Sequence, residues 1–170
     1  DKETADIAIQ SALTGHLVLS TLHTNDAPSS IVRLIDMGVE PFLISSSVIG
    51  VIAQRLVRKI CPYCKKEIPI NDEVKKVMEE FNISPGEMRI FHGEGCQHCK
   101  GTGYKGRTAI FELMTINESI REMIYKNATL SEIRETAIKK NGMITLKEDG
   151  LRNIIQGITT IEEVVRTTST

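Results

Sequence analysis

Tryptophan is absent from the 170 residues, and aromatic residues make up only 4% of the sequence. Proteins that hold single-stranded nucleic acid stack bases on aromatic side chains, so this scarcity argues against such a surface. The formal net charge is −1, so the chain lacks the basic excess that attracts a phosphate backbone. No apolar run reaches the roughly 18 residues of a membrane-spanning helix. What remains is an ordinary globular composition, 41% hydrophobic and 25% charged.

The first ten residues, DKETADIAIQ, are charged and amphipathic, unlike a secretory signal peptide. They lack an initiator methionine and read as though they begin inside a helix, so we expect a piece of a longer protein. The spacing of apolar residues predicts a helix over 2–13 that ends at Gly15.

The stretch Thr14 to Ala27, TGHLVLSTLHTNDA, predicts a buried strand over 16–23 that delivers polar groups to its C-terminal end. In open α/β sheets, ligands bind at that edge. His16 and His23 flank the strand seven residues apart, so they should point to opposite faces and cannot share one ligand. His23 is nearer the expected ligand edge. The alternative for each histidine is a hydrogen-bonded residue at a sheet edge.

The rest of the chain predicts an α/β protein with a helical end. We expect a helix from Asp26 to Gly38 and another over 43–60, bent near Gly50, whose basic residues suit a helix C-terminus. A strand is expected over 108–116. Capping residues then predict a small bundle of helices packed on the α/β part, beginning at Asn117, Thr129, Thr145 and about residue 160.

Four cysteines form two C-x-x-C pairs, Cys61 with Cys64 and Cys96 with Cys99, separated by 31 residues. This spacing is typical of a structural tetracysteine zinc site, which keeps no open position for catalysis. A disulfide framework is the alternative, although it suits smaller secreted domains. A short helix over about 72–81 and a turn at SPGE are expected between the pairs.

Other candidate features near the cysteines have structural explanations. His92 and His98 are expected to be solvated loop residues, because four thiolates already saturate the ion. KGTGYKGR at 100–107 is similar to a phosphate-binding loop only in composition, and G-x-x-x-x-G-K-[ST] does not occur in the sequence. A zinc ribbon that binds nucleic acid is disfavoured by the charge and the few aromatics.

Four stretches together resemble the secretion ATPases, the hexameric motors of type II secretion and type IV pilus assembly: TGHLVLSTLHTNDA, RLIDMGVEPFLISSS, AQRLVRKICPYCK and GCQHCKGTGYKGRTAIFEL. The resemblance covers essentially the whole chain. PFLISSS, AQRLVR and the cysteine pairs look more like the type II secretion ATPase than the pilus retraction ATPase, which lacks those pairs. The pilus assembly ATPase shares them and is the close alternative.

The resemblance implies the C-terminal part of a RecA-like P-loop NTPase domain, with a tetracysteine zinc subdomain and a C-terminal helical bundle. Its expected segments are ATPase core (1–60), zinc subdomain (61–107), returning strand (108–116) and helical region (117–170). It makes TGHLVLSTLHT the His box, with His16, Thr21 and His23 as nucleotide-sensing residues and His23 as the catalytic candidate that positions the γ-phosphate. It also implies Zn²⁺ at the cysteines, and ATP with Mg²⁺ in the whole protein.

The family's Walker A and Walker B motifs are expected upstream of Asp1, so we expect the 170 residues alone to be inactive. The resemblance further implies a cytoplasmic hexamer peripheral to the inner membrane, with platform and cytoplasmic-domain proteins as partners and no nucleic acid. Arg55 could lie at a subunit contact or be only a helix C-terminal cation. An interaction module stabilised by zinc, without enzymatic activity, is the alternative from another class.

Overall fold

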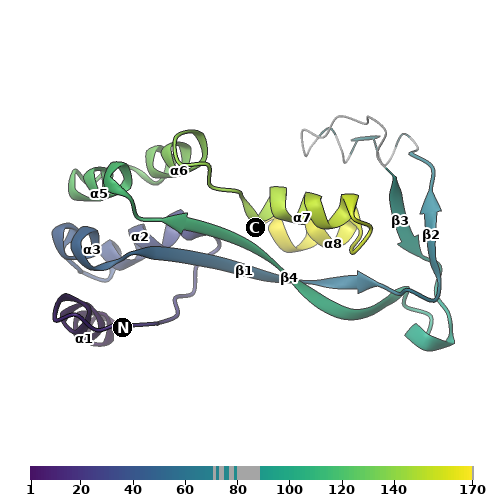
Figure 1. Cartoon of the computed structure of the whole chain (residues 1–170), viewed down its shortest axis with the longest axis horizontal. Helices are drawn as coiled ribbons and strands as arrows, with labels where there is room; N and C mark the ends of the chain where they lie inside the picture. Colours follow the sequence, from purple (N-terminus) through teal and green to yellow (C-terminus); the bar gives the residue numbers. More distant parts are fainter. Residues whose placement is uncertain (71, 73–74, 77–78, 80–88, 170) are drawn as a thin grey trace. The chain divides into compact units, whose positions relative to one another are not determined.

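The computed structural model describes residues 1–70, 72, 75–76, 79 and 89–169. The chain divides into two compact units, and each is built from two separate stretches of sequence, unlike the four consecutive segments expected above. Unit 1 comprises Asp1–Ala53 and Glu112–Thr145, and unit 2 comprises Gln54–Phe111 and Leu146–Thr170. Both strands of one two-stranded sheet, β1 (Gly50–Ile60) and β4 (Tyr104–Thr115), contribute residues to each unit (Figure 1).

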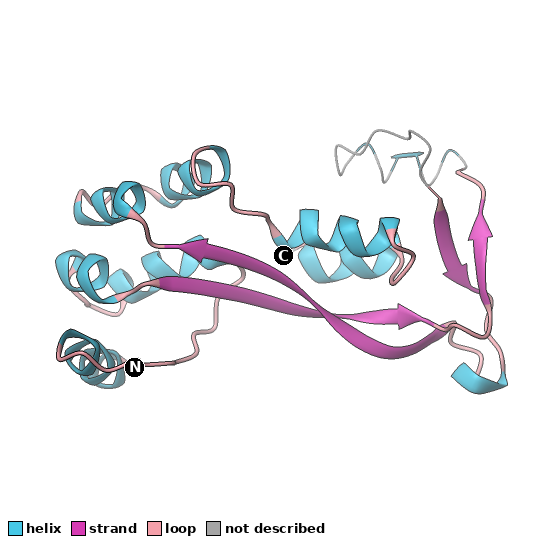
Figure 2. Cartoon of the chain, viewed as in Figure 1, coloured by secondary structure: helices cyan, strands magenta, loops and turns pink. Residues whose placement is uncertain are grey.

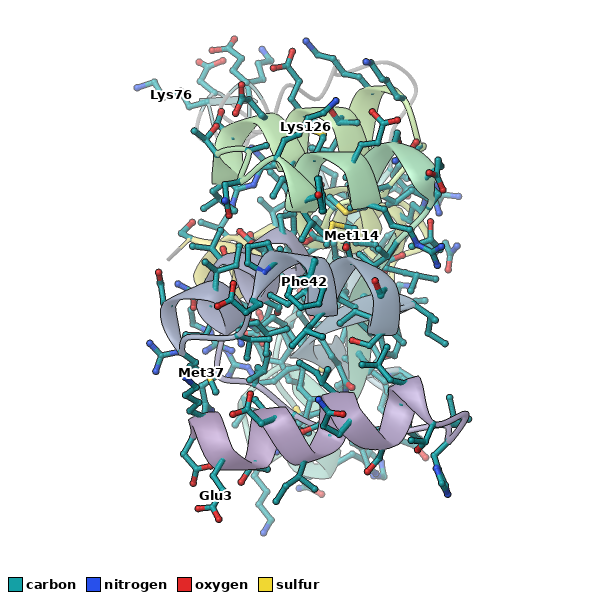
Figure 3. The ribbon with its side chains drawn as sticks, turned by 90° about the vertical axis from the view of Figure 1, so that its left-hand side faces the viewer. Glu3, Met37, Phe42, Lys76, Met114 and Lys126 are labelled. Atoms are coloured by element: carbon teal, nitrogen blue, oxygen red, sulfur yellow. The ribbon has the colours of Figure 1, made fainter. Side chains whose placement is uncertain are left out.

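Unit 1 is a set of helices packed around one end of that sheet. Helix α1 contacts α3, α3 contacts α5, and α2 and α5 both contact α6. Viewed onto these helices, Met114 of β4 lies at the level between α3 and the green helices α5 and α6 (Figure 3). The helices are α1 (Lys2–Leu13), α2 (Ala27–Asp36), α3 (Pro41–Ser47), α5 (Glu118–Tyr125) and α6 (Leu130–Lys139).

The core of unit 1 is aliphatic, as the lack of aromatics requires. Ile31, Ile44 and Ile120 are fully buried, and each comes from a different helix. Side-chain caps begin α1, α2, α5 and α6, whereas α3 has none. Each cap oxygen accepts a hydrogen bond from an otherwise unpaired amide of the first turn. Asn117 caps α5, and Thr129 with Glu132 forms the reciprocal capping box of α6. The predicted helices over 2–13 and from Asn117 and Thr129 are therefore confirmed.

Unit 2 joins a β-hairpin to a pair of helices. Strands β2 (Lys65–Ile68) and β3 (Ile90–Gly93) pair antiparallel, with Lys65 opposite Gly93 and Ile68 opposite Ile90. Helices α7 (Leu146–Ile155) and α8 (Ile161–Thr168) pack on each other, and Ile154 and Val164 share a core with Ile90 of the hairpin. The turn between the helices uses Gly157, whose φ of 65° favours glycine.

The single helix predicted over 43–60 is wrong. The chain forms α3, which ends at Ser47, and then the strand β1, which begins at Gly50. Beyond Gly50, partly or fully buried residues alternate with exposed ones, the period of a strand, and β4 supplies the hydrogen-bonding partner. The basic residues Arg55, Arg58 and Lys59 therefore lie on a strand, where no helix dipole accounts for their positions.

The buried strand predicted over 16–23 is also wrong. These residues form no helix or strand, and Figure 2 draws the connection between α1 and α2 as a loop. Leu17 and Leu19 are 77% and 89% exposed. A strand needs a neighbouring strand for its amides and carbonyls, and the two sheets in the described part of the chain pair only β1 with β4 and β2 with β3.

The single C-terminal bundle is corrected as well. The last four helices form two pairs, α5 with α6 in unit 1 and α7 with α8 in unit 2, because Thr145 ends one unit and Leu146 begins the next segment of the other. The strand predicted over 108–116 is confirmed as part of β4. Most of the helix expected at 72–81, and the SPGE turn, lie outside the described residues. Among the described helices, none is long and apolar enough to cross a bilayer.

Candidate functional site

The four cysteines come together in unit 2. Cys61 and Cys64 lie in the turn that leads from β1 into β2. Cys96 caps the short 3-10 helix η1 (Gln97–Cys99) that follows β3, and Cys99 is its last residue. The two turns are joined by backbone hydrogen bonds, since the Glu94 amide donates to the Cys64 carbonyl at 3.1 Å. The hairpin thus brings two sequence-distant C-x-x-C turns to one place.

The sulfur atoms have the separations of a tetrahedral metal site. All four lie within 4.8 Å of one another, and three of the Sγ–Sγ distances are 3.9 Å (Cys61–Cys96), 3.8 Å (Cys64–Cys99) and 3.7 Å (Cys96–Cys99). A tetrahedron with metal–sulfur bonds of about 2.3 Å has edges of about 3.8 Å. A disulfide would need about 2.05 Å, so the thiols are free. Four cysteines in this geometry can hold one metal ion.

The protein stabilises negative charge on one of these sulfurs. Burial raises the pKa of the Cys99 thiol, but donation from the Cys96 amide at 3.1 Å and the Gly103 amide at 3.3 Å outweighs it and lowers that pKa to about 6. Burial raises the pKa of Cys64 to about 12. A bound cation would favour the thiolate at all four positions, because thiolates are the metal-ligating form.

Close backbone packing supports the turns that carry the cysteines. A Cβ added to Gly93 would lie 2.0 Å from the Gly103 carbonyl oxygen, so only glycine permits this approach. Gly103 has a φ of 76° and its carbonyl accepts from the Cys61 amide at 2.9 Å. KGTGYKGR thus serves here as a structural turn that enters β4. On the surface, Tyr63 stacks on His98 with ring centroids 3.9 Å apart.

The histidine segment lies in unit 1, and its two histidines have different surroundings. His16 is exposed at the end of α1, where its Nδ1 lies 3.2 Å from both the Ser11 carbonyl oxygen and Thr14 Oγ1. Thr21 is exposed and in no regular element. His23 stands just before α2.

His23 lines an open groove that runs along one face of α2. Its cavity volume is about 320 Å³, and its wall combines a histidine, an arginine and an aspartate with small polar groups. The lining residues are His23, Thr24, Asn25, Ser29, Val32, Arg33, Asp36 and Leu130. Of the two histidines in this segment, His23 is the one that lines this groove, and imidazole there can donate to or accept from a polar ligand.

The start of α2 is held by Asp26, the cap predicted from the sequence, and by two side chains that the sequence did not indicate, Glu112 and Arg134. Asp26 caps the helix by accepting from the Ser29 amide at 2.8 Å, and it also forms an ion pair with Arg134 of α6. Glu112 of β4 is only 4% exposed and accepts from the Ala27 amide at 2.8 Å. One sequence signal could have found Glu112, since it is the single charge on the face that also carries Ile110 and Met114.

The arginines of β1 have different surroundings. Arg55, a candidate either for a subunit contact or for a helix C-terminal cation, is partly buried within unit 2 and lies on a strand. Arg58 reaches the carboxylate of Glu163 in α8 and lies over the Tyr104 ring, 4.1 Å from its centroid. Arg58 therefore has an internal structural role.

Comparison with known families shows which proteins this chain is similar to. A family described as "Type II/IV secretion system protein" matches residues 1–166. The chain is 51% identical to the type IV pilus assembly ATPase PilB of Thermus thermophilus, over 99% of this chain and 19% of that protein. It is 46% identical to the type II secretion system ATPase E of Vibrio cholerae, over 99% of this chain and 33% of that protein. The chain thus spans a third or less of these curated relatives.

A solved structure shares the fold. The pilus retraction motor PilT with bound ADP superposes with a TM-score of 0.61 at 23% sequence identity, over all of this chain and 37% of that one. At this identity the similarity establishes the architecture only.

Proposed function

Because the chain belongs to the family of type II/IV secretion system proteins, we propose that it is the His-box and metal-binding part of a motor ATPase. The observation that best supports this proposal is the 51% and 46% identity, across 99% of the chain, to proteins named as ATPases. Since the chain spans a third or less of those relatives, the catalytic activity belongs to the whole protein. There the 170 residues form the C-terminal part of a RecA-like P-loop domain, a proposal with which the fold similarity to PilT agrees.

Within that protein, His23 positions or senses the γ-phosphate of ATP, and His16 and Thr21 belong to the same nucleotide-sensing segment. The groove beside His23 supports this role, because the imidazole stands exposed at its edge with Arg33 on the same wall. Phosphoryl transfer to water depends on positioning and charge stabilisation, and Mg²⁺ with a phosphate-binding loop would supply most of it. In this chain the contribution of His23 would be a directed hydrogen bond.

The tetracysteine centre holds Zn²⁺ in a structural role. Four sulfur ligands suit zinc, and they leave no position for a water or a substrate. The ion would fasten the turns after β1 and β3, and so fix where the hairpin of unit 2 begins.

The motor assembles as a hexamer in the cytoplasm, against platform and cytoplasmic-domain proteins at the inner membrane, with Arg55 at a contact between subunits. Its output is pseudopilus assembly in type II secretion, and the alternative is type IV pilus extension. Named relatives of both kinds match the chain at similar identity, 51% for the pilus assembly ATPase and 46% for the type II secretion ATPase. Deleting the gene separates the two, because one reading predicts retained exoproteins and the other predicts loss of surface pili.

The decisive test measures ATP hydrolysis by the whole protein and by its His23→Ala variant. The variant should lose most of its turnover while it stays folded by circular dichroism, and His92→Ala, a histidine in β3, should keep it. If the wild-type protein has no ATPase activity, the ATPase assignment fails and the alternative, an interaction module stabilised by zinc, is favoured. Normal turnover in His23→Ala would remove His23 from the mechanism but leave the ATPase assignment intact.

A further inference from the structure

We propose that Glu112 is a positioning residue for His23, and that its buried carboxylate sets the start of α2 and thereby the orientation of residues 23–26. The role of His23 in nucleotide chemistry rests on the proposed function. The structural claim, that Glu112 fixes the place of His23, stands on the contacts of unit 1.

The first turn of α2 shows why Glu112 is needed. With Asp26 as the N-cap, the amide of Ser29 at the third position is satisfied by the Asp26 carboxylate, and Pro28 at the second position has no amide hydrogen. The amide of Ala27 at the first position donates to Oε1 of Glu112 at 2.8 Å. Ala27 is completely buried, so water cannot replace the carboxylate if it is removed.

The position of Glu112 in β4 also calls for a specific role. Its neighbours on the same face of the strand, Ile110 and Met114, are 0% and 1% exposed, so an aliphatic residue would fit the pattern. Burying a carboxylate here costs free energy unless hydrogen-bond donors contact it. The N-terminus of α2 supplies such a donor and is the positive end of the helix dipole. The strand therefore carries a buried charge at the position where it contacts the first turn of α2, and the contact offsets the cost of burying that charge.

The anchored residues run directly into His23. Thr24 Oγ1 lies 2.8 Å from Ser30 Oγ, which ties the residue after His23 to α2. Asp26 is held between the Ser29 amide and Arg134. Residues 16–22 before His23 form no regular structure, so the position of the imidazole follows from the anchors on its C-terminal side.

A purely stabilising role makes a different prediction. In that case, any loss of the carboxylate would lower stability without moving His23. In the positioning role, an acceptor at residue 112 matters more than its charge, because the amide oxygen of glutamine can still accept from Ala27. Glu112→Gln should therefore preserve the site, and Glu112→Leu, which keeps bulk and removes the acceptor, should displace it.

The first experiment records amide NMR spectra of the 170-residue chain. Glu112→Leu should shift the Ala27 and His23 amide signals and speed hydrogen exchange at Ala27, while Glu112→Gln should leave both near their wild-type values. Glu163→Gln is the matched control, since it removes a buried carboxylate from unit 2 and should leave the two signals in place. Unchanged His23 and Ala27 signals in Glu112→Leu would overturn the proposal.

The second experiment measures ATP turnover in the whole protein. Glu112→Leu should lower kcat about tenfold or more with KM for ATP nearly constant, because a misplaced group weakens the transition state more than binding. Glu112→Gln should recover most of kcat, and Glu163→Gln should retain it. Equal loss in Glu112→Gln and Glu112→Leu would contradict positioning. If the wild-type protein hydrolyses no ATP, the proposed function fails, and the NMR result still decides the place of His23.

Discussion

Nη2 of Arg58 lies 2.6 Å from Oε1 of Glu163, and the Arg58 backbone amide donates to Oε2 of the same carboxylate at 2.9 Å. Arg166 adds two further donors at 3.0 and 3.1 Å. Glu163 is 1% exposed, so its charge is held entirely by these contacts. The carboxylate thus connects β1 to α8 within unit 2.

This cluster makes the stability of unit 2 depend on pH. Burial alone would raise the pKa of Glu163, but the hydrogen bonds from Arg58 and Arg166 lower it to about 2. Because the folded pKa lies below the unfolded value of about 4.5, the stabilisation is complete above pH 4.5 and is lost as pH falls towards 2. Glu163→Gln should cost about 2–3 kcal/mol at pH 7 and less at pH 3, as measured by urea unfolding. The exposed neighbour Glu162→Gln should change stability by less than about 0.5 kcal/mol.

Metal binding should depend on each cysteine. Cys61→Ser is expected to reduce bound zinc from one ion per chain to nearly none and to loosen the metal-bearing part of unit 2, since a structural site contributes folding free energy. Elemental analysis measures the first effect and thermal unfolding the second. His98→Ala is the control, because His98 stacks on Tyr63 and should not affect the ion. Retained zinc in Cys61→Ser would refute a four-thiolate site.

Nucleotide affinity should be weak in the 170-residue chain by itself. G-x-x-x-x-G-K-[ST] does not occur in it, so the amides and the lysine that grip the β- and γ-phosphates are not supplied by these residues. We expect a Kd for ATP above about 1 mM by calorimetry, equivalent to less than about 4 kcal/mol of binding free energy. A sub-millimolar Kd would disprove the expectation.

Gly150 should resist replacement by alanine although it lies within a helix. Alanine at an open helical position is usually about 1 kcal/mol better than glycine. Here the added Cβ would come within 2.5 Å of Val164 Cγ1 across the contact between α7 and α8. We expect Gly150→Ala to destabilise the chain by about 1–3 kcal/mol, and Val164→Ala in the same chain to recover part of the loss. Additive costs in the double variant would indicate a different cause.

The parts of the fold that follow from local chemistry could be predicted from the sequence. Asn117 and the Thr129–Glu132 pair begin their helices as expected, because capping involves residues only a few positions apart. The four cysteines converge as expected, because each C-x-x-C turn directs its two sulfur atoms to the same side of the turn. Each cap and each C-x-x-C pair is complete within a few residues, even though the two cysteine pairs are 31 residues apart.

The errors arose where a distant partner decides the structure. The run LISSSVIGVIAQRLVRKI fits a helix as well as a strand, and pairing of β1 with β4 resolves the ambiguity. Residues 16–23 have strand-forming side chains, yet no described strand pairs with them. Glu112 was missed because its partner, the Ala27 amide, is 85 residues away.

The buried charge in β4 has a consequence for how the strand finds its register. Both faces of β4 are apolar around Glu112, since Phe111 and Leu113 are about half exposed on one face while Ile110 and Met114 are buried on the other. A slip of one residue would exchange the faces, and hydrophobicity alone would barely oppose it. The bond from Ala27 to Glu112 forms in only one of these alignments. Without that carboxylate, the chain should refold through a competing misaligned state, visible as an added slow phase.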